Sequence, residues 1–247
     1  MSKQYKLLII FCLLFFLSCS KHFVEQKTEP THYLLKEYSD NEILKNTLTT
    51  YKNKIDSATN TVIASTTDFL TKDGANCTLG NFCCDALYYG AKKFYKTDSV
   101  DLVIINRGGL RINLPKGDIK IGTIFELMPF ENELVLVTIK GEKLLEALPT
   151  LHNNPHPFYG MKVVFKDNRV VLATINNNQI DKTKNYNIIT SDFLAYGGDN
   201  FLFLKNPVEL KKSNLKIRDV FIDYCNYLTQ NKQQIIPYTD DRLHISK

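Results

Sequence analysis

The sequence predicts an α+β fold in which mixed sheets pack against helices. Two segments with helical periodicity come first, at residues 41–63 and 79–94, and strand-like segments dominate from residue 101 onward. A regular alternation of strands and helices, which a parallel α/β sheet would require, is not seen. With 247 residues, 44% of them hydrophobic, the chain can bury the core of one large domain or two small ones.

The N-terminal segment has the features of an export signal. Lys3 and Lys6 precede the apolar run 7–17, which is too short to span a membrane and suits a signal peptide. Residues 16–19, Phe-Leu-Ser-Cys, then resemble a bacterial lipoprotein signal with Cys19 as the lipidated residue, although such signals more often carry leucine at the position of Phe16. We therefore expect an exported protein, lipid-anchored to a bacterial membrane and facing the periplasm or the cell surface. An ordinary signal peptide with an incidental cysteine is the alternative.

The domain organisation depends on this interpretation. Residues 1–18 form the signal peptide, residues 19–38 a polar and aperiodic tether that contains Pro30, and residues 39–247 the folded domain. Removing the two lysines of the signal from 31 basic residues leaves 29 against 26 acidic ones, a net charge of +3. The basic residues are scattered, so a nucleic-acid-binding surface is not expected.

The two predicted helices have different surroundings. The first runs to about residue 63, a strand candidate covers residues 62–69, and a turn is expected at Asp73-Gly74. The second helix groups its apolar residues on one face and also carries Asn81 and Asp85, which are four residues apart. These two polar residues either hydrogen-bond a neighbouring loop or face solvent.

The remainder of the chain is predicted to form mainly strands. A short helix is expected at residues 143–148, a loop at 152–157 and a last helix at 215–227. The expected strands are residues 102–105, 134–139, 161–165, 170–175 and 186–190, the third and fourth of which form a hairpin across residues 166–168.

Four cysteines remain after the N-terminal region, namely Cys77, Cys83, Cys84 and Cys225. Export would allow disulfide bonds, but buried free thiols explain the same residues. No spacing matches a zinc site, and no metal ligands are expected in this chain.

Three glycine-rich or polar loops carry the candidate binding residues. In the loop 106–111, Asn-Arg-Gly-Gly-Leu-Arg, paired glycines allow a ligand to approach the backbone, and Arg111 can bind phosphate through two parallel hydrogen bonds. A tight loop with a surface arginine is the alternative. In the loop 128–132, Phe130 either packs in the core or presents its ring to a base, and Asn132 offers an amide to a base edge.

The segment 191–199, Ser-Asp-Phe-Leu-Ala-Tyr-Gly-Gly-Asp, is the most specific of the three. Phe193 and Asp199 bracket a Gly-Gly turn, and a carboxylate there can accept hydrogen bonds from two vicinal hydroxyls. Tyr196 and Phe201 are expected to be packing residues. Together the three loops suit a nucleotide, and they contain no obvious nucleophile, so no catalytic residue is expected in this chain.

The ordered set of motifs resembles the C-terminal, substrate-binding domain of the 5′-nucleotidases over residues 41–235. The motifs are LGNFCCDA at 79–86, NRGGLR at 106–111, GDI at 117–119, MPFEN at 128–132, GEKLLEAL at 141–148 and SDFLAYGGDNF at 191–201. The resemblance implies an α+β domain of that type and a set of ligand-binding roles. Phe130 and Phe193 would sandwich the base, Asp199 would hold the ribose hydroxyls, Arg111 would contact ribose or phosphate, and Asn106, Asn132 and Gly160 would lie near the base.

Two departures from the family pattern shape the expected function. The family has further arginines just before the LGN helix, where this chain offers only Lys72 as a basic residue, and it has an N-terminal metallophosphatase domain whose metal-binding motifs are missing here. We therefore expect a nucleotide- or nucleoside-binding domain that acts with a separate metallophosphatase chain, which would hold two divalent metals. A surface or periplasmic lipoprotein that only scavenges nucleosides is one alternative, and a structural lipoprotein with an empty pocket is another.

Overall fold

The computed structural model describes residues 42–246 except residues 75, 97–98 and 241. The predicted signal peptide, Cys19 and the tether lie outside the described residues. The chain divides into two units between Thr47 and Leu48, and only the start of helix α2 (Glu42–Thr59) is described in the first of them. Within the described part of the chain, no helix has both the length and the apolar character needed to cross a membrane.

The second unit is an α+β domain, as the sequence predicts. Its strands are β1 (Val62–Thr66), β2 (Leu102–Ile104), β3 (Gly117–Lys120), β4 (Glu133–Lys140), β5 (Phe158–Tyr159), β6 (Met161–Lys166), β7 (Arg169–Ile175), β8 (Asn178–Gln179), β9 (Asn185–Ser191), β10 (Glu209–Lys216) and β11 (Leu243–Ser246). Its helices after α2 are α3 (Thr78–Tyr95), α4 (Ile121–Leu127), α5 (Gly141–Asn153), α6 (Asp192–Ala195) and α7 (Ile217–Gln230), with short 3-10 helices η1 (Arg107–Gly109), η2 (Gly198–Asn200) and η3 (Leu202–Leu204).

A five-stranded mixed sheet forms the centre of the domain, in the order β10-β4-β9-β2-β5. Strand β9 runs parallel to β2 and antiparallel to β4, and β10 runs antiparallel to β4. Strands β2, β4 and β9 are almost entirely buried, since their side chains alternate between two hydrophobic clusters. In β2, for example, Val103 points into one cluster, whereas Leu102 and Ile104 point into the other.

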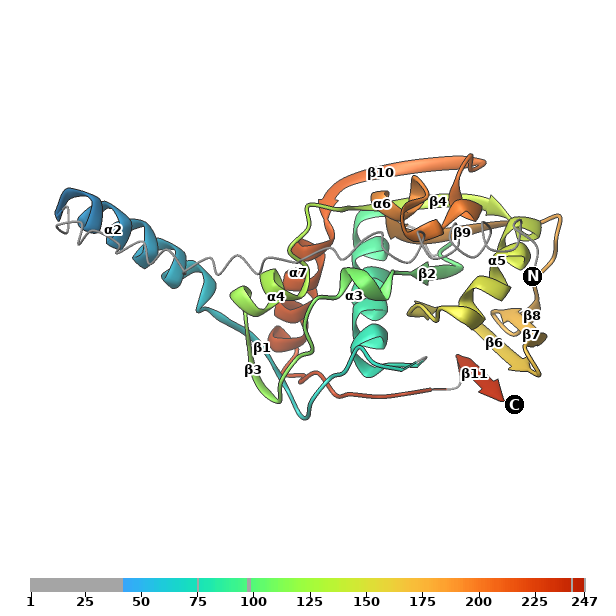
Figure 1. Cartoon of the computed structure of the whole chain (residues 1–247), viewed down its shortest axis with the longest axis horizontal. Helices are drawn as coiled ribbons and strands as arrows, with labels where there is room; N and C mark the ends of the chain where they lie inside the picture. Colours follow the sequence, from blue (N-terminus) through green and yellow to red (C-terminus); the bar gives the residue numbers. More distant parts are fainter. Residues whose placement is uncertain (1–41, 75, 97–98, 241, 247) are drawn as a thin grey trace, which may run out of the picture. The chain divides into compact units, whose positions relative to one another are not determined.

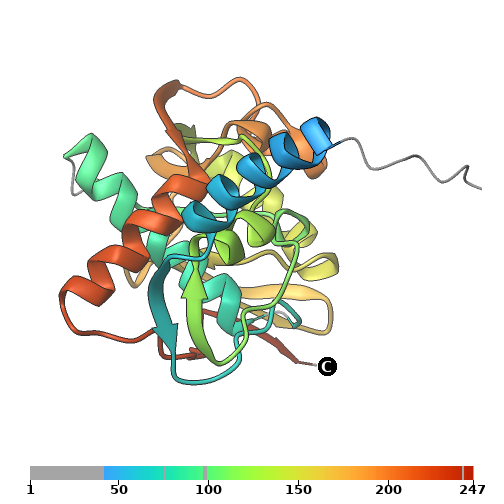
Figure 2. The ribbon, with the colours of Figure 1, turned by 90° about the vertical axis from the view of Figure 1, so that its left-hand side faces the viewer.

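Each face of the central sheet is covered by a different layer. Helices α3 and α7 pack on one face, and they lie side by side in both views (Figures 1 and 2). The other face packs against α5 and a four-stranded sheet of order β11-β6-β7-β8. Strands β1 and β3 form a separate antiparallel ribbon, seen as the neighbouring teal and green strands in Figure 2.

Most predicted elements are confirmed, with one correction in the middle of the chain. Helix α5 continues to Asn153, so His152 belongs to the helix and its ring lies 4.9 Å from that of Phe165. The apolar spacing of Leu144, Leu148 and Leu151 continues across Pro149, and burial of these leucines against the central sheet keeps the segment helical.

The hairpin and the thiols agree more closely with the sequence. Asp167 and Asn168 both have positive φ values, 48° and 61°, as a two-residue turn between twisted strands requires. The four cysteines are all free and buried, and burial raises the pKa of the Cys225 thiol to about 12. They therefore behave as small apolar core residues and not as disulfide partners.

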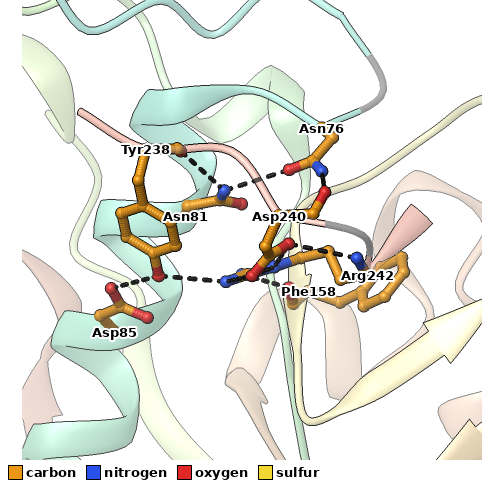
Figure 3. Close-up of polar contacts among 7 residues, drawn as sticks. All are labelled: Asn76, Asn81, Asp85, Phe158, Tyr238, Asp240 and Arg242. Carbon is orange, nitrogen blue, oxygen red and sulfur yellow. Dashed lines mark hydrogen bonds and ion pairs between the residues drawn. The ribbon is translucent and has the colours of Figure 1, made fainter. Parts of the chain in front are cut away.

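A polar network that includes Tyr238, Asp240 and Arg242 is attached to α3 at Asn81 and Asp85 (Figure 3). Arg242 donates to both carboxylate oxygens of Asp240 at 2.7 Å, to the Phe158 carbonyl at 2.7 Å and to the Tyr238 hydroxyl at 3.0 Å. That hydroxyl donates to Asp85 at 2.7 Å, and the Asn81 amide donates to the Tyr238 carbonyl at 3.0 Å. The two polar residues of the predicted helix therefore do hydrogen-bond a neighbouring segment.

Burial raises the pKa of Asp240, but the hydrogen bonds from Arg242 outweigh burial and hold the pKa below its ordinary value. The pair is consequently ionised at neutral pH. Because Arg242 is only 8% exposed, its charge depends on these partners to offset the loss of hydration.

Arg242→Met should lower the free energy of unfolding by about 2–3 kcal/mol, because Asp240 and the Phe158 carbonyl would lose their donor in a partly buried place. Urea denaturation of the wild type and the variant measures this loss. Glu209→Gln, which breaks the exposed Lys211–Glu209 pair, is the matched control and should cost less than about 0.5 kcal/mol. Equal effects of the two substitutions would show that the network is not a major source of stability.

Candidate functional site

The candidate site lies at one edge of the central sheet, where four chain connections meet. Because β2 and β9 are parallel, their C-terminal ends share this edge, and the antiparallel β4 begins there. Strand β10 ends at the same edge and leads directly into α7. The cavity has a volume of about 240 Å³ and is lined by Ile105, Asn106, Gly108, Gly109, Arg111, Met128, Phe130, Asn132, Ser191, Phe193, Asp199 and Ile217.

The structure brings together six of the seven binding residues expected from the sequence. These are Asn106, Arg111, Phe130, Asn132, Phe193 and Asp199. Gly160 does not line the cavity, because it follows β5 at the opposite end of β2. It has a φ of +87°, and a Cβ there would lie 2.3 Å from the Asp101 carbonyl oxygen. Glycine is therefore required by the backbone conformation and by this close approach.

The two phenylalanines present their rings to the cavity and to solvent. Phe130 is 38% exposed and Phe193 is 44% exposed, so neither is a core residue. Gly198 makes room for the second ring, since a Cβ at this position would lie 2.5 Å from the ring of Phe193. The interpretation of Phe130 as a core residue is therefore wrong, and both rings are available to a flat ligand.

Hydrogen bonds of Ser191 and Asp192 set the position of Phe193. Ser191 caps α6 by accepting a hydrogen bond from the Leu194 amide at 3.1 Å. The Asp192 carboxylate accepts from the Phe193 amide at 2.8 Å and from the Glu133 amide at 3.0 Å, which joins α6 to the start of β4. The Ser-Asp-Phe sequence thus fixes the turn that carries the ring.

Tyr196 and Phe201 were both expected to be packing residues, but only one of them is buried. Phe201 is buried, but Tyr196 is 58% exposed, with the Lys212 ammonium 5.7 Å from its ring. The expectation for Tyr196 is therefore wrong, although Leu194 and Ala195 just before it are buried.

Asp199 is held by the side chain of Asn106, whose amide donates to its Oδ2 atom at 2.6 Å. The other oxygen, Oδ1, makes no hydrogen bond to any part of the chain that the structure describes. Asp199 has a φ of 49°, so its backbone is in the left-handed region. Asn106 therefore orients the carboxylate and leaves one oxygen for a ligand.

Among the described residues, Arg111 is the single basic side chain that lines the cavity. Its Nη1 atom donates to the Gly108 carbonyl at 3.1 Å, and its guanidinium lies 5.2 Å from the ring of Phe130. Lys72 does not line the cavity: its ammonium donates to the carbonyls of Leu110 and Arg111, at 2.9 Å and 3.3 Å. Lys72 thus supports the loop backbone that carries Arg111.

Arg218, at the start of α7, supports the loop that carries Phe130 and was not expected from the sequence. Its guanidinium is buried, lies 4.1 Å from the ring of Phe125 and donates to Glu131 at 2.6 Å. The hydrogen bond from Arg218 lowers the pKa of Glu131. The amide of Ile217 also donates to the Asn132 carbonyl at 2.9 Å, so the first turn of α7 holds this loop at two points.

His156 is a second residue that the sequence did not single out. It is 4% exposed, accepts a hydrogen bond from the Arg107 amide at 3.3 Å and lies 4.8 Å from the ring of Phe201. Burial, followed by the charge of Arg107, lowers its pKa to about 4. His156 is therefore neutral at physiological pH. It supports the loop 106–111 through the hydrogen bond that it accepts from the Arg107 amide. In the sequence, only its position between Pro155 and Pro157 could have indicated this structural role.

The chemical inventory of the cavity suits binding. Two aromatic rings, one carboxylate, one guanidinium and the Asn132 amide face a space of small-molecule size. In the described residues, no group of three or more His, Cys, Asp or Glu side chains is arranged to hold a metal ion.

Comparisons with known proteins indicate the family of this chain. A family model described as 5′-nucleotidase, C-terminal domain, matches residues 56–206. An apyrase of Tabanus yao is 28% identical over 197 residues, which cover 68% of this chain and 36% of the apyrase. A 5′-nucleotidase-related protein of Glossina morsitans morsitans is 26% identical over 225 residues, or 79% of this chain and 40% of that protein.

The same kind of protein is found among solved structures with this fold. The crystal structure of a 5′-nucleotidase precursor from Thermus thermophilus superposes with a TM-score of 0.67 and 22% identity, over 83% of this chain and 43% of that one. The chain spans less than half of the length of each of these relatives.

His156→Asn should remove a component of the pH dependence of stability. Since the folded state lowers the pKa of His156 from 6.5 to about 4, the unfolded state binds the proton more tightly, and stability falls as the pH is lowered through this window. The loss amounts to at most about 3 kcal/mol. Urea denaturation between pH 4 and pH 6.5 measures it for both proteins. Parallel profiles for wild type and variant would contradict this assignment.

Proposed function

The chain belongs to the 5′-nucleotidase C-terminal domain family, and from this premise we propose that it binds the nucleoside part of a nucleotide for a 5′-nucleotidase system. The observation that carries the proposal is the pair of exposed rings, Phe130 and Phe193, on one cavity with Asp199. A base would stack between the rings, at roughly 1–3 kcal/mol for each face. Asn132 would contact the base edge.

The polar groups of the cavity suit the rest of such a ligand. The free Oδ1 atom of Asp199 would accept from the ribose hydroxyls, and Asn106 keeps the carboxylate in place for them. Arg111 would contact the ribose or the first phosphate. With one basic and one acidic side chain, the lining is balanced in formal charge. The nucleoside therefore supplies most of the recognition at this site.

We place the hydrolytic chemistry in a metallophosphatase outside these 247 residues, acting as a separate chain with two divalent metals. The relatives support chemistry outside the matched region, because that region makes up only 36% of the apyrase and 40% of the 5′-nucleotidase-related protein. This domain would hold the nucleoside so that the phosphate is oriented for attack at the metal centre. The N-terminal sequence supports export and lipid anchoring at Cys19.

One observation favours a second function, that of a lipoprotein that only scavenges nucleosides. Arg111 is the single basic side chain on the cavity, and Lys72 is committed to backbone carbonyls. A nucleoside without phosphate would satisfy such a site. Activity with a metallophosphatase distinguishes the two functions.

Phe193→Ala should weaken adenosine and AMP binding by one stacking face, roughly 1–3 kcal/mol, without a comparable loss of stability. Titration calorimetry and a melting curve measure the two effects on the same samples. The control is Phe201→Ala, which truncates a buried ring and should cost about 3–5 kcal/mol of stability. No binding by the wild type at millimolar ligand, or a similarly large loss of stability in Phe193→Ala, would overturn the assignment.

The isolated domain should show no 5′-nucleotidase activity with added divalent metal, and activity should appear on mixing with a metallophosphatase chain from the same source. In that mixture Asp199→Asn and Arg111→Ala should raise KM more than they lower kcat, because both residues position the substrate. Steady-state phosphate release measures both constants. Metal-dependent turnover by this chain alone, abolished by changing its own residues, would refute the two-chain arrangement.

A further inference from the structure

A second hollow, of about 500 Å³, lies on the helical layer of the domain and shares no lining residue with the nucleoside cavity. We call it the tyrosine groove. It is lined by Asp85, Tyr88, Tyr89, Lys92 and Lys93 of α3, Tyr159 of β5 and Tyr224 of α7. Nothing in the nucleoside site accounts for this group of side chains.

The rings of the groove form two sets. Tyr88 of α3 packs against Tyr159 of β5, with centroids 4.8 Å apart. Tyr89 packs against Tyr224 of α7 at 5.3 Å and against Tyr227 at 4.7 Å. Helix α3 thus supplies one tyrosine to each set, and the hollow is bordered by aromatic surface from three elements.

Asp85 lies close to both sets of rings. Its Oδ2 atom accepts the hydrogen bond from the Tyr238 hydroxyl, at the end of the network seen in Figure 3. Its Oδ1 atom makes no hydrogen bond to the described residues. Burial raises the pKa of Tyr224 to about 12, and the charge of Asp85 is the second cause, which is consistent with a carboxylate that faces the groove.

The charges around the groove disfavour a charged ligand. The Lys92 ammonium lies 5.6 Å from the ring of Tyr88, the Lys93 ammonium 5.7 Å from that of Tyr89, and the Arg242 guanidinium 5.8 Å from that of Tyr159. These rings already face cations, which weakens their attraction for a further cation. An anion would meet Asp85, and Lys93 is already neutralised by Asp223 at 2.7 Å.

The groove also offers hydrogen-bonding groups along its aromatic surface. In the part of the chain that the structure describes, the hydroxyls of Tyr88, Tyr159 and Tyr224 donate to no partner, and the Oδ1 atom of Asp85 accepts from none. The matching ligand is neutral, with apolar ring faces and hydroxyl groups around its edge. We propose that the tyrosine groove binds a neutral pyranose sugar, free or as part of an oligosaccharide. This site is independent of the proposed nucleoside function.

The absence of tryptophan makes the proposal directly measurable, because the intrinsic fluorescence of the chain comes from its 13 tyrosines. The full domain would be titrated with neutral tetrasaccharides of glucose, mannose and N-acetylglucosamine, and the change in tyrosine fluorescence would be recorded beside calorimetry. At least one of them should bind with a millimolar or lower Kd. Saturating adenosine should leave this Kd unchanged, since the two sites share no residue.

Variants identify the groove as the binding surface. Tyr88→Ala should weaken saccharide binding about tenfold through the lost ring face. Asp85→Asn and Tyr88→Phe, which keep the packing, should each weaken it about threefold through a lost hydrogen bond. Tyr51→Ala, in an exposed tyrosine of α2 away from the groove, is the matched control and should bind as the wild type does.

Four results would overturn the proposal. Two concern the saccharides: none of the three tetrasaccharides binds at millimolar concentration, or all three groove variants bind as the wild type does. Two concern adenosine: adenosine displaces the saccharide, or adenosine alone occupies the groove. Melting curves establish that each variant is folded, and the conservative Asp85→Asn and Tyr88→Phe variants decide the matter if Tyr88→Ala does not fold. Loss of adenosine binding with saccharide binding retained would instead count against the proposed nucleoside function.

Discussion

The relative direction of β2, β4 and β9 is the constraint on which the rest of the domain depends. All three strands are almost entirely buried, so the polar residues that line the cavity lie at or beyond their ends. Since β9 is parallel to β2 and antiparallel to β4, the end of two strands and the start of the third fall at one edge. Three loops far apart in the sequence therefore meet around one cavity.

Most of the fold and of the candidate site could be predicted from the sequence, because both depend on local signals. Apolar periodicity located the helices and the buried strands, and Gly-Gly turns beside polar residues located the loops with Asn106 and Asp199. The polar edge strand β10 was not predicted, because one of its faces is solvated and its alternation is weak. Arg218 and His156 were also missed, because their roles come from contacts across the tertiary structure.

The site residues act as supported pairs. Asn106 orients Asp199, Asp192 orients Phe193, and Arg218 holds the loop that carries Phe130. Each supporting residue lies on another element or in the adjacent turn, so the candidate residues are held by hydrogen bonds within the protein. Such preorganisation limits the conformational entropy that ligand binding must overcome, which matters most for a small neutral ligand such as a nucleoside.

The attachment of Tyr238 and β11 to earlier parts of the domain has a consequence for when the chain can fold. Tyr238 contacts α3, and β11 completes the sheet beside β6, so these contacts join segments separated by some 80 to 160 residues. The second unit cannot close until this segment has left the ribosome, and contacts of such sequence separation form slowly. A polypeptide that stays open late in synthesis is well suited to translocation in an extended state, which is the route that the predicted signal peptide would provide.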